Sequence, residues 1–125
     1  MNKILIIEDD PLMARMYKRV LQLEGFYIEM ALDGVEGYEK AKTFIPDLIL
    51  LDVMMPRLNG LQTLEKLKTD PFLAKIKVVM LTNLANKKDA AFALQKGAIK
   101  YLIKSEYDPK QVIAIIKEVL QAPQN

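Results

Sequence analysis

The sequence contains no cysteine and no histidine among its 125 residues. Without cysteine, the chain cannot form disulfides, use a thiol as nucleophile or bind a metal through thiolates. Without histidine, it has no histidine nucleophile, no zinc–histidine site and none of the side chains that usually change charge near neutral pH. These two absences exclude much of the chemistry that is common in enzymes.

Long apolar runs are also missing, since none approaches the roughly 20 residues of a membrane span. The first apolar run is short and meets Glu8, so the amino terminus does not look like a secretory signal. The net charge of +2, from 18 basic and 16 acidic residues, is too balanced to indicate nucleic-acid binding. We expect a cytoplasmic protein with no membrane insertion and no direct contact with nucleic acid.

Short strand-like runs alternate with longer helical patterns about five times along the chain. Such alternation predicts an α/β fold, in which five helices cover both faces of a five-stranded parallel sheet through right-handed crossovers. The length fits one domain. The predicted strands are Lys3–Ile7, Phe26–Met30, Leu48–Leu51, Lys77–Leu81 and Ile99–Ile103.

The strands also differ in their polarity. The first, third and fourth are continuous apolar runs, as expected of strands covered on both faces, whereas the second and fifth carry the interior charges Glu29 and Lys100. Strands two and five are therefore predicted at the edges, in the doubly wound, flavodoxin-like order 2-1-3-4-5. Another doubly wound order remains open, because each edge assignment depends on one charge.

Helix boundaries are marked by local signals. Asp10 and Asp108 each precede a proline, which is typical of a capped helix start. The DGVE segment at residues 33–36 resembles a capping box. Gly25 and Gly97 mark helix ends or turns.

Polar residues follow four of the strands abruptly. Because the carboxyl ends of parallel strands lie along one edge of the sheet, where open α/β folds bind ligands, these residues should meet. Several carboxylates close together repel one another unless a cation lies among them, and Mg²⁺ (or Mn²⁺) prefers such oxygen ligands. The residues are Glu8, Asp9 and Asp10 after the first strand, Asp52 after the third, Thr82 and Asn83 after the fourth, and Lys104 after the fifth.

Four segments, IIEDDP, LLDVMMP, VVMLTN and YLIKS, together resemble the receiver domain of two-component response regulators, of the chemotaxis-regulator-like kind. The intervals are 43 residues from Asp9 to Asp52, 30 from Asp52 to Thr82 and 22 from Thr82 to Lys104. The resemblance covers essentially the whole chain. We therefore expect residues 1–125 to form a single receiver domain, with residues 121–125 as a terminal tail or the start of a linker.

The resemblance implies a phosphorylation site. Asp52 would accept a phosphoryl group, Asp9 would bind the metal directly, Glu8 would act through a bound water, and the backbone carbonyl of Met54 would complete the protein ligands. Lys104 would offset the charge repulsion between the carboxylate and an anionic phosphate. Asp10 is assigned to helix capping rather than to the metal, because Pro11 follows it.

The resemblance also implies how a signal leaves the site. Thr82 would move toward a phosphoryl oxygen on Asp52, and Tyr101 would turn inward, which changes the surface of the fourth helix, fifth strand and fifth helix. Tyr101 could instead simply pack at the edge of the sheet. The expected partners are a sensor histidine kinase or phosphotransfer protein, an output partner at that surface, and a second copy of the chain on phosphorylation.

Two residues depart from the family pattern. Ser105 follows Lys104 where proline is usual, and a trans peptide bond is favoured because a cis bond without proline costs about 2.5 to 4 kcal/mol. Asn83 is bulkier than the small residue usual after the threonine. Asn83 should narrow the access to Asp52, while Met54 and Leu84 make the rim of the site apolar. We therefore expect a slow loss of phosphate, because few side chains can orient an attacking water.

On this interpretation the protein is not an enzyme but a phosphoacceptor that assists its own phosphorylation and dephosphorylation. One alternative is a magnesium-dependent phosphatase with an aspartyl nucleophile, of the haloacid-dehalogenase type. That class resembles DxD after its first strand, whereas this chain has Glu8, Asp9 and Asp10 there and its best nucleophile on the third strand. Another alternative is a receiver-like scaffold that never takes phosphate.

Overall fold

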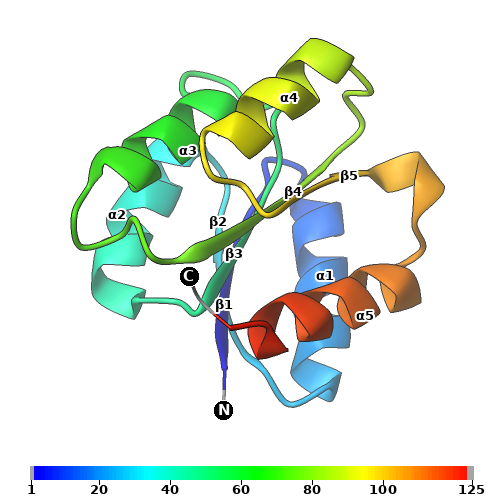
Figure 1. Cartoon of the computed structure of the whole chain (residues 1–125). Helices are drawn as coiled ribbons and strands as arrows, with labels where there is room; N and C mark the ends of the chain where they lie inside the picture. Colours follow the sequence, from blue (N-terminus) through cyan, green and yellow to red (C-terminus); the bar gives the residue numbers. More distant parts are fainter. Residues whose placement is uncertain (1, 124–125) are drawn as a thin grey trace.

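The computed structural model describes residues 2–123 and contains a central sheet flanked by helices (Figure 1). Strands and helices alternate along the chain, and the short 3₁₀ helix η1 follows the last strand. The elements are β1 (Lys3–Ile7), α1 (Pro11–Leu23), β2 (Tyr27–Ala31), α2 (Gly34–Phe44), β3 (Leu48–Leu51), α3 (Gly60–Thr69), β4 (Lys77–Thr82), α4 (Lys87–Gln95), β5 (Lys100–Ile103), η1 (Lys104–Glu106) and α5 (Pro109–Gln121).

The five strands form one parallel sheet in the order β2-β1-β3-β4-β5. This confirms the α/β class and the predicted strand order. The strands with interior charges, Glu29 in β2 and Lys100 in β5, are the two edge strands, where both side chains remain exposed. The polar interruptions in the sequence therefore correctly marked the limits of the sheet.

Two separate cores lie on the two faces of the sheet. Leu5 and Ile7 of β1 point toward α2, α3 and α4, whereas Ile4 and Ile6 point toward α1 and α5. Figure 1 shows this division, with α1 and α5 together on one side of the sheet. A central strand buries both sets of side chains, which explains the continuous apolar runs in the sequence.

The predicted helix starts are confirmed for α1 and α5. The Asp10 carboxylate accepts hydrogen bonds from the first turn of α1, and Asp108 forms a capping box with Gln111 in α5. The DGVE segment is only half a capping box: Asp33 caps α2, but Glu36 accepts from the amide of Leu32 rather than from that of Asp33.

The strand boundaries differ slightly from the prediction. The strand β2 begins at Tyr27 because the amide of Phe26 is bonded to Leu21 at the end of α1. The strand β4 extends to Thr82 and β5 begins at Lys100, one residue later than predicted in each case.

The carboxyl-terminal helix α5 includes Gln121, so it continues one residue into the predicted tail. The last two residues of that tail, 124–125, lie outside the described residues. Within residues 2–123, no helix is both long enough and apolar enough to cross a membrane.

Candidate functional site

Three carboxylates meet at the carboxyl ends of β1 and β3. Glu8 and Asp9 directly follow β1, Asp52 directly follows β3, and the Asp52 amide donates a 3.0 Å hydrogen bond to the carbonyl of Ile7. One carboxylate oxygen from each acid lies within 4.8 Å of those of the other two. The adjacency of β1 and β3 thus joins residues that are 43 positions apart, as the sequence predicted.

These carboxylates differ in their access to solvent. Glu8 and Asp52 are only 5% and 6% exposed, whereas Asp9 is exposed at the mouth of the cluster. An all-oxygen set with one accessible member suits a hard divalent cation, which keeps part of its water shell. The donor set therefore fits Mg²⁺ or Mn²⁺, and Glu8, Asp9 and Asp52 could hold the ion.

Lys104 provides the fixed positive charge of the site. It begins η1 directly after β5, and its Nζ lies 2.5 Å from a carboxylate oxygen of Glu8 and 3.4 Å from one of Asp52. The described chain, residues 2–123, contains no cis peptide bond, so the predicted trans bond before Ser105 is confirmed. A trans backbone thus allows Lys104 to reach both acids.

Burial and charge have opposing effects on this cluster. Burial, opposed by the hydrogen bond from Lys104 and aided by repulsion from Asp52, raises the pKa of Glu8 to about 7. Burial acts to lower the pKa of Lys104, but its contacts with Glu8 and Asp52 outweigh this and raise the pKa above its ordinary value. Lys104 is therefore held as a cation. Its single positive charge is too small to balance three carboxylates.

Thr82 and Tyr101 are connected through one residue between them. The hydroxyl of Thr82, which is fully buried at the end of β4, accepts a 3.2 Å hydrogen bond from the amide of Leu84. The hydroxyl of Tyr101 donates a 2.8 Å hydrogen bond to the carbonyl of the same Leu84. Both predicted switch residues therefore hold the β4–α4 connection. The role of Leu84 was not predicted, because a backbone contact leaves no signal in the side-chain pattern.

The loop between β3 and α3 packs directly against the backbone of Asp52. The amide of Met54 donates a 3.3 Å hydrogen bond to the Asp52 carboxylate. A Cβ atom added to Gly60 would lie 2.0 Å from the carbonyl oxygen of Asp52. Gly60 was not predicted as part of the site, because its only signal in the sequence is the Asn-Gly pair at 59–60, which is typical of turns in general.

The predicted rim of the site is only partly apolar. Met54 is 57% exposed, Leu84 is half-buried, and Asn83 is exposed at the start of the β4–α4 connection. Asp10 is occupied by capping α1, since its carboxylate accepts from the amides of Leu12 and Met13. This confirms that Asp10 caps α1.

Residues 4–117 match the family model described as the response regulator receiver domain. The chain belongs to this family. A receiver domain is a component of two-component signalling, and the observed strand order, acidic cluster and lysine are those expected from the resemblance.

Individual proteins give the same result. The receiver domain is 35% identical over 121 residues to the DNA-binding dual master transcriptional regulator RpaA of Synechocystis sp.. The alignment covers 97% of this chain but only 50% of RpaA. The chain therefore spans about half the length of that curated relative.

Solved structures extend the comparison to the fold. A CheY-like response regulator receiver domain protein from Methanospirillum hungatei superposes with a TM-score of 0.90 at 31% identity, over 96% of this chain and 94% of that one. The Mn²⁺-bound form of response regulator Rcp1 superposes with a TM-score of 0.85 at 27% identity, over 98% and 97% of the two chains.

Proposed function

We propose that this receiver domain is a switch controlled by phosphorylation of Asp52. The observation that carries the proposal is the nearly buried Asp52 carboxylate, which lies beside two other acids and 3.4 Å from the Lys104 ammonium. A carboxylate in such a place costs several kcal/mol unless its charge is compensated. Its placement is explained if the same charges that compensate it also make it reactive.

In the proposed step, an oxygen of Asp52 forms a bond to the phosphorus of a phosphohistidine on a sensor histidine kinase or phosphotransfer protein. The phosphorus–nitrogen bond breaks, and the imidazole leaves with the electron pair. Because the transition state is loose, the protein contributes mainly position and charge. Lys104 stabilises the phosphoryl oxygens, and the Met54 amide orients the nucleophile.

A divalent ion, Mg²⁺ or Mn²⁺, would neutralise part of the negative charge of the carboxylate and phosphate when bound. We assign Asp9 as a direct ligand, Glu8 as a ligand through water, and Asp52 and the Met54 carbonyl as the others. The accessible position of Asp9 and the clustering of the three acids support this assignment. The similar response regulator Rcp1 has been solved in a Mn²⁺-bound form, which supports a divalent ion in this family.

The proposed output follows from the contacts of Leu84. If the Thr82 hydroxyl moves to a phosphoryl oxygen, it releases the amide of Leu84, and the β4–α4 connection becomes free to move. Tyr101 is bonded to the other side of Leu84 and is coupled to that movement. The face formed by α4, β5 and α5 would then change its shape, and with it its affinity for an output partner or a second copy of the chain.

The test is the intact mass of the protein after incubation with acetyl phosphate, with and without Mg²⁺, for wild type and Asp52→Asn. One phosphoryl adduct that needs Mg²⁺ and disappears in Asp52→Asn is the expected result. Folded protein without an adduct would contradict the proposal and favour a scaffold that never takes phosphate. Steady turnover of a phosphate ester would instead favour the aspartyl phosphatase.

A further inference from the structure

A cavity of about 840 Å³ lies at the opposite end of the sheet from Asp52. Lys77 and Lys100, the first residues of β4 and β5, line it together with the end of α5. Because the strands are parallel, their amino ends lie at the edge of the sheet away from the phosphorylation site. None of the residues assigned to that site lines this cavity.

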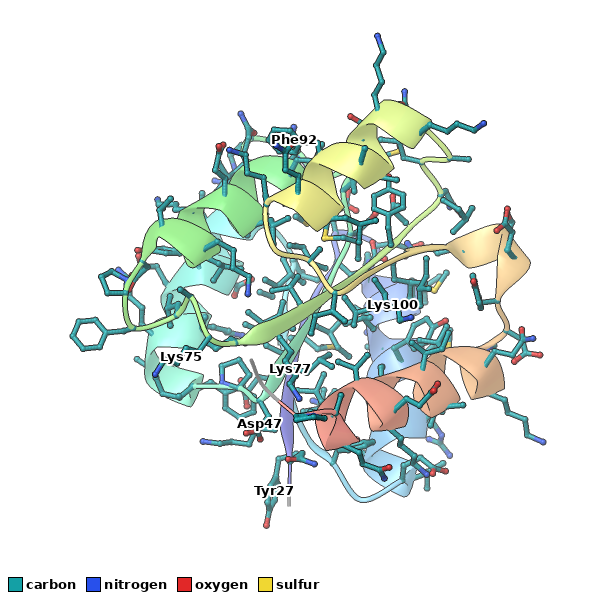
Figure 2. All side chains as sticks on the ribbon, viewed as in Figure 1. Tyr27, Asp47, Lys75, Lys77, Phe92 and Lys100 are labelled. Atoms are coloured by element: carbon teal, nitrogen blue, oxygen red, sulfur yellow. The ribbon has the colours of Figure 1, made fainter. Side chains whose placement is uncertain are left out.

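The charge of the cavity lining is strongly positive. Four lysines, Lys68, Lys75, Lys77 and Lys100, face one acid, Glu118. Figure 2 shows Lys77 and Lys100 between α4 and α5, with Lys75 farther to the left, beside α2. These five side chains carry a formal charge of +3, whereas the whole chain carries only +2.

Two of these ammonium groups are held in place by backbone carbonyls. The Nζ of Lys68 donates to the carbonyls of Ala74 and Ile76 at 2.9 and 2.7 Å. The Nζ of Lys77 donates to those of Val119 and Ala122 at 2.8 and 2.9 Å. An ammonium has three N–H donors, so each lysine keeps one for a ligand.

In the part of the chain that the structure describes, no carboxylate forms an ion pair with Lys68 or Lys77. Burial lowers the pKa of Lys68 below its ordinary value. Within residues 2–123, the ammonium of Lys100 forms no ion pair or hydrogen bond. The cavity therefore offers two fixed cations and one mobile cation to an anion.

The walls between the lysines are mostly apolar. Ile76, Ile99 and Val119 contribute aliphatic side chains. Small-molecule sites typically occupy 300 to 1,000 Å³ and combine apolar walls with a few placed polar groups. Lysine ammonium groups bind phosphate as point charges. The size and lining thus favour a compact phosphorylated molecule over an extended acidic peptide.

We propose that this cavity binds a small organic phosphate of the nucleotide class, with its phosphates at Lys68, Lys77 and Lys100 and its flat portion against Ile99 and Val119. The proposal does not depend on phosphorylation of Asp52, because the two sites share no residue. A ligand here would contact the start of β5 and the end of α5, which are part of the proposed output face.

The test is an NMR titration of the uniformly ¹⁵N-labelled protein with ATP, in EDTA so that no divalent ion bridges the phosphates to the acidic cluster. Saturating shifts are expected for the amides of Gly97, Ile99 and Lys100, with those of Asp52 and Thr82 unchanged. Adenosine and inorganic triphosphate, titrated separately, should each bind more weakly than ATP if both parts of the ligand contribute.

Two charge-reversal variants provide the control. Lys100→Glu should weaken ATP binding about tenfold or more, the loss expected from one charge-assisted contact. Lys110→Glu has the same change in net charge, on an exposed lysine outside the cavity, and should bind ATP like wild type. The spectrum of each unliganded variant reports whether it is folded.

Three results would overturn the proposal. The first is the absence of saturating shifts at Gly97 and Lys100. The second is equal weakening by Lys100→Glu and Lys110→Glu, which would indicate nonspecific attraction. The third is tighter binding of an oligoglutamate peptide than of ATP, which would identify an acidic peptide as the ligand class.

Discussion

The hydroxyl of Tyr101 donates a 2.8 Å hydrogen bond to the backbone carbonyl of Leu84. The bond connects the edge strand β5 to the segment that leaves β4 beside the proposed phosphorylation site. Because Leu84 is also bonded to Thr82, the position of the aromatic side chain is linked to that of the threonine hydroxyl.

Removing this bond should loosen the β4–α4 connection without affecting phosphate acceptance. Tyr101→Phe deletes only the hydroxyl and should lower the free energy of unfolding by about 1 kcal/mol. Hydrogen exchange at Leu84 should accelerate, while acetyl phosphate still produces the adduct. Tyr107→Phe is the control, since the Tyr107 hydroxyl forms no hydrogen bond within residues 2–123. Unchanged exchange at Leu84 in Tyr101→Phe would argue against the link.

Neutralising the proposed phosphoacceptor should stabilise the metal-free protein. In Asp52→Asn, Lys104 keeps its 2.5 Å contact with Glu8, while the repulsion of Asp52 from the other two acids disappears. We expect the free energy of unfolding to rise by about 1 kcal/mol or more. Urea unfolding in EDTA at neutral pH measures it.

The control for that experiment is Glu106→Gln, which removes an exposed carboxylate outside the cluster. Its effect should stay within about 0.5 kcal/mol. An Asp52→Asn protein less stable than wild type would show that Lys104 already compensates the cluster fully.

The close approach of Gly60 to Asp52 predicts a positional effect on the site. In Gly60→Ala, the new Cβ must displace the Asp52 backbone, because its ideal position is 2.0 Å from the carbonyl oxygen. We expect a loss of stability of about 1 to 3 kcal/mol and slower adduct formation with acetyl phosphate. Intact-mass time courses measure the rate.

Gly25→Ala separates general destabilisation from this local effect. Gly25 has a φ of +96° but no atom within 4 Å of an added Cβ, so the substitution costs only backbone strain at the end of α1. It should leave the rate of adduct formation unchanged. If both variants form the adduct equally slowly, the effect of Gly60→Ala is general destabilisation rather than displacement of Asp52.

The phosphorylated state should persist for minutes or longer at neutral pH. We expect few side chains at the rim to orient an attacking water, and we expect Asn83 to restrict access to Asp52. Decay of the adduct after removal of acetyl phosphate measures the lifetime, and Asn83→Ala should shorten it. A wild-type half-life of seconds would contradict this prediction.

Much of the fold was predictable because simple physical rules act locally. Strands covered on both faces need continuous apolar runs, and edge strands tolerate a charge such as Glu29 or Lys100. The caps at Asp10 and Asp108 were recognisable because a carboxylate before proline suits a helix start. The exact strand limits were less predictable, since cross-strand pairing and helix-end hydrogen bonds set them.

The side chains of the candidate site were also predictable, because a parallel sheet brings its carboxyl strand ends together. The backbone contacts were not. Leu84 connects Thr82 to Tyr101 through its peptide groups, and any residue other than proline offers the same donor and acceptor. The basic cavity was missed for a similar reason, since its lysines come from separate segments and look like a solvated surface in sequence.

The sequence alone determined the α/β class and the meeting of Glu8, Asp52 and Lys104 at one edge of the sheet, because the carboxyl ends of parallel strands lie together. It favoured the observed strand order through the polarity of the edge strands but left another doubly wound order open. Only the tertiary structure decided the distances, the left-handed backbone of Ile45 and Arg57, and the fixed orientation of Lys68 and Lys77. These features depend on contacts between segments distant in the chain, which outweigh local preference and have no local pattern to reveal them.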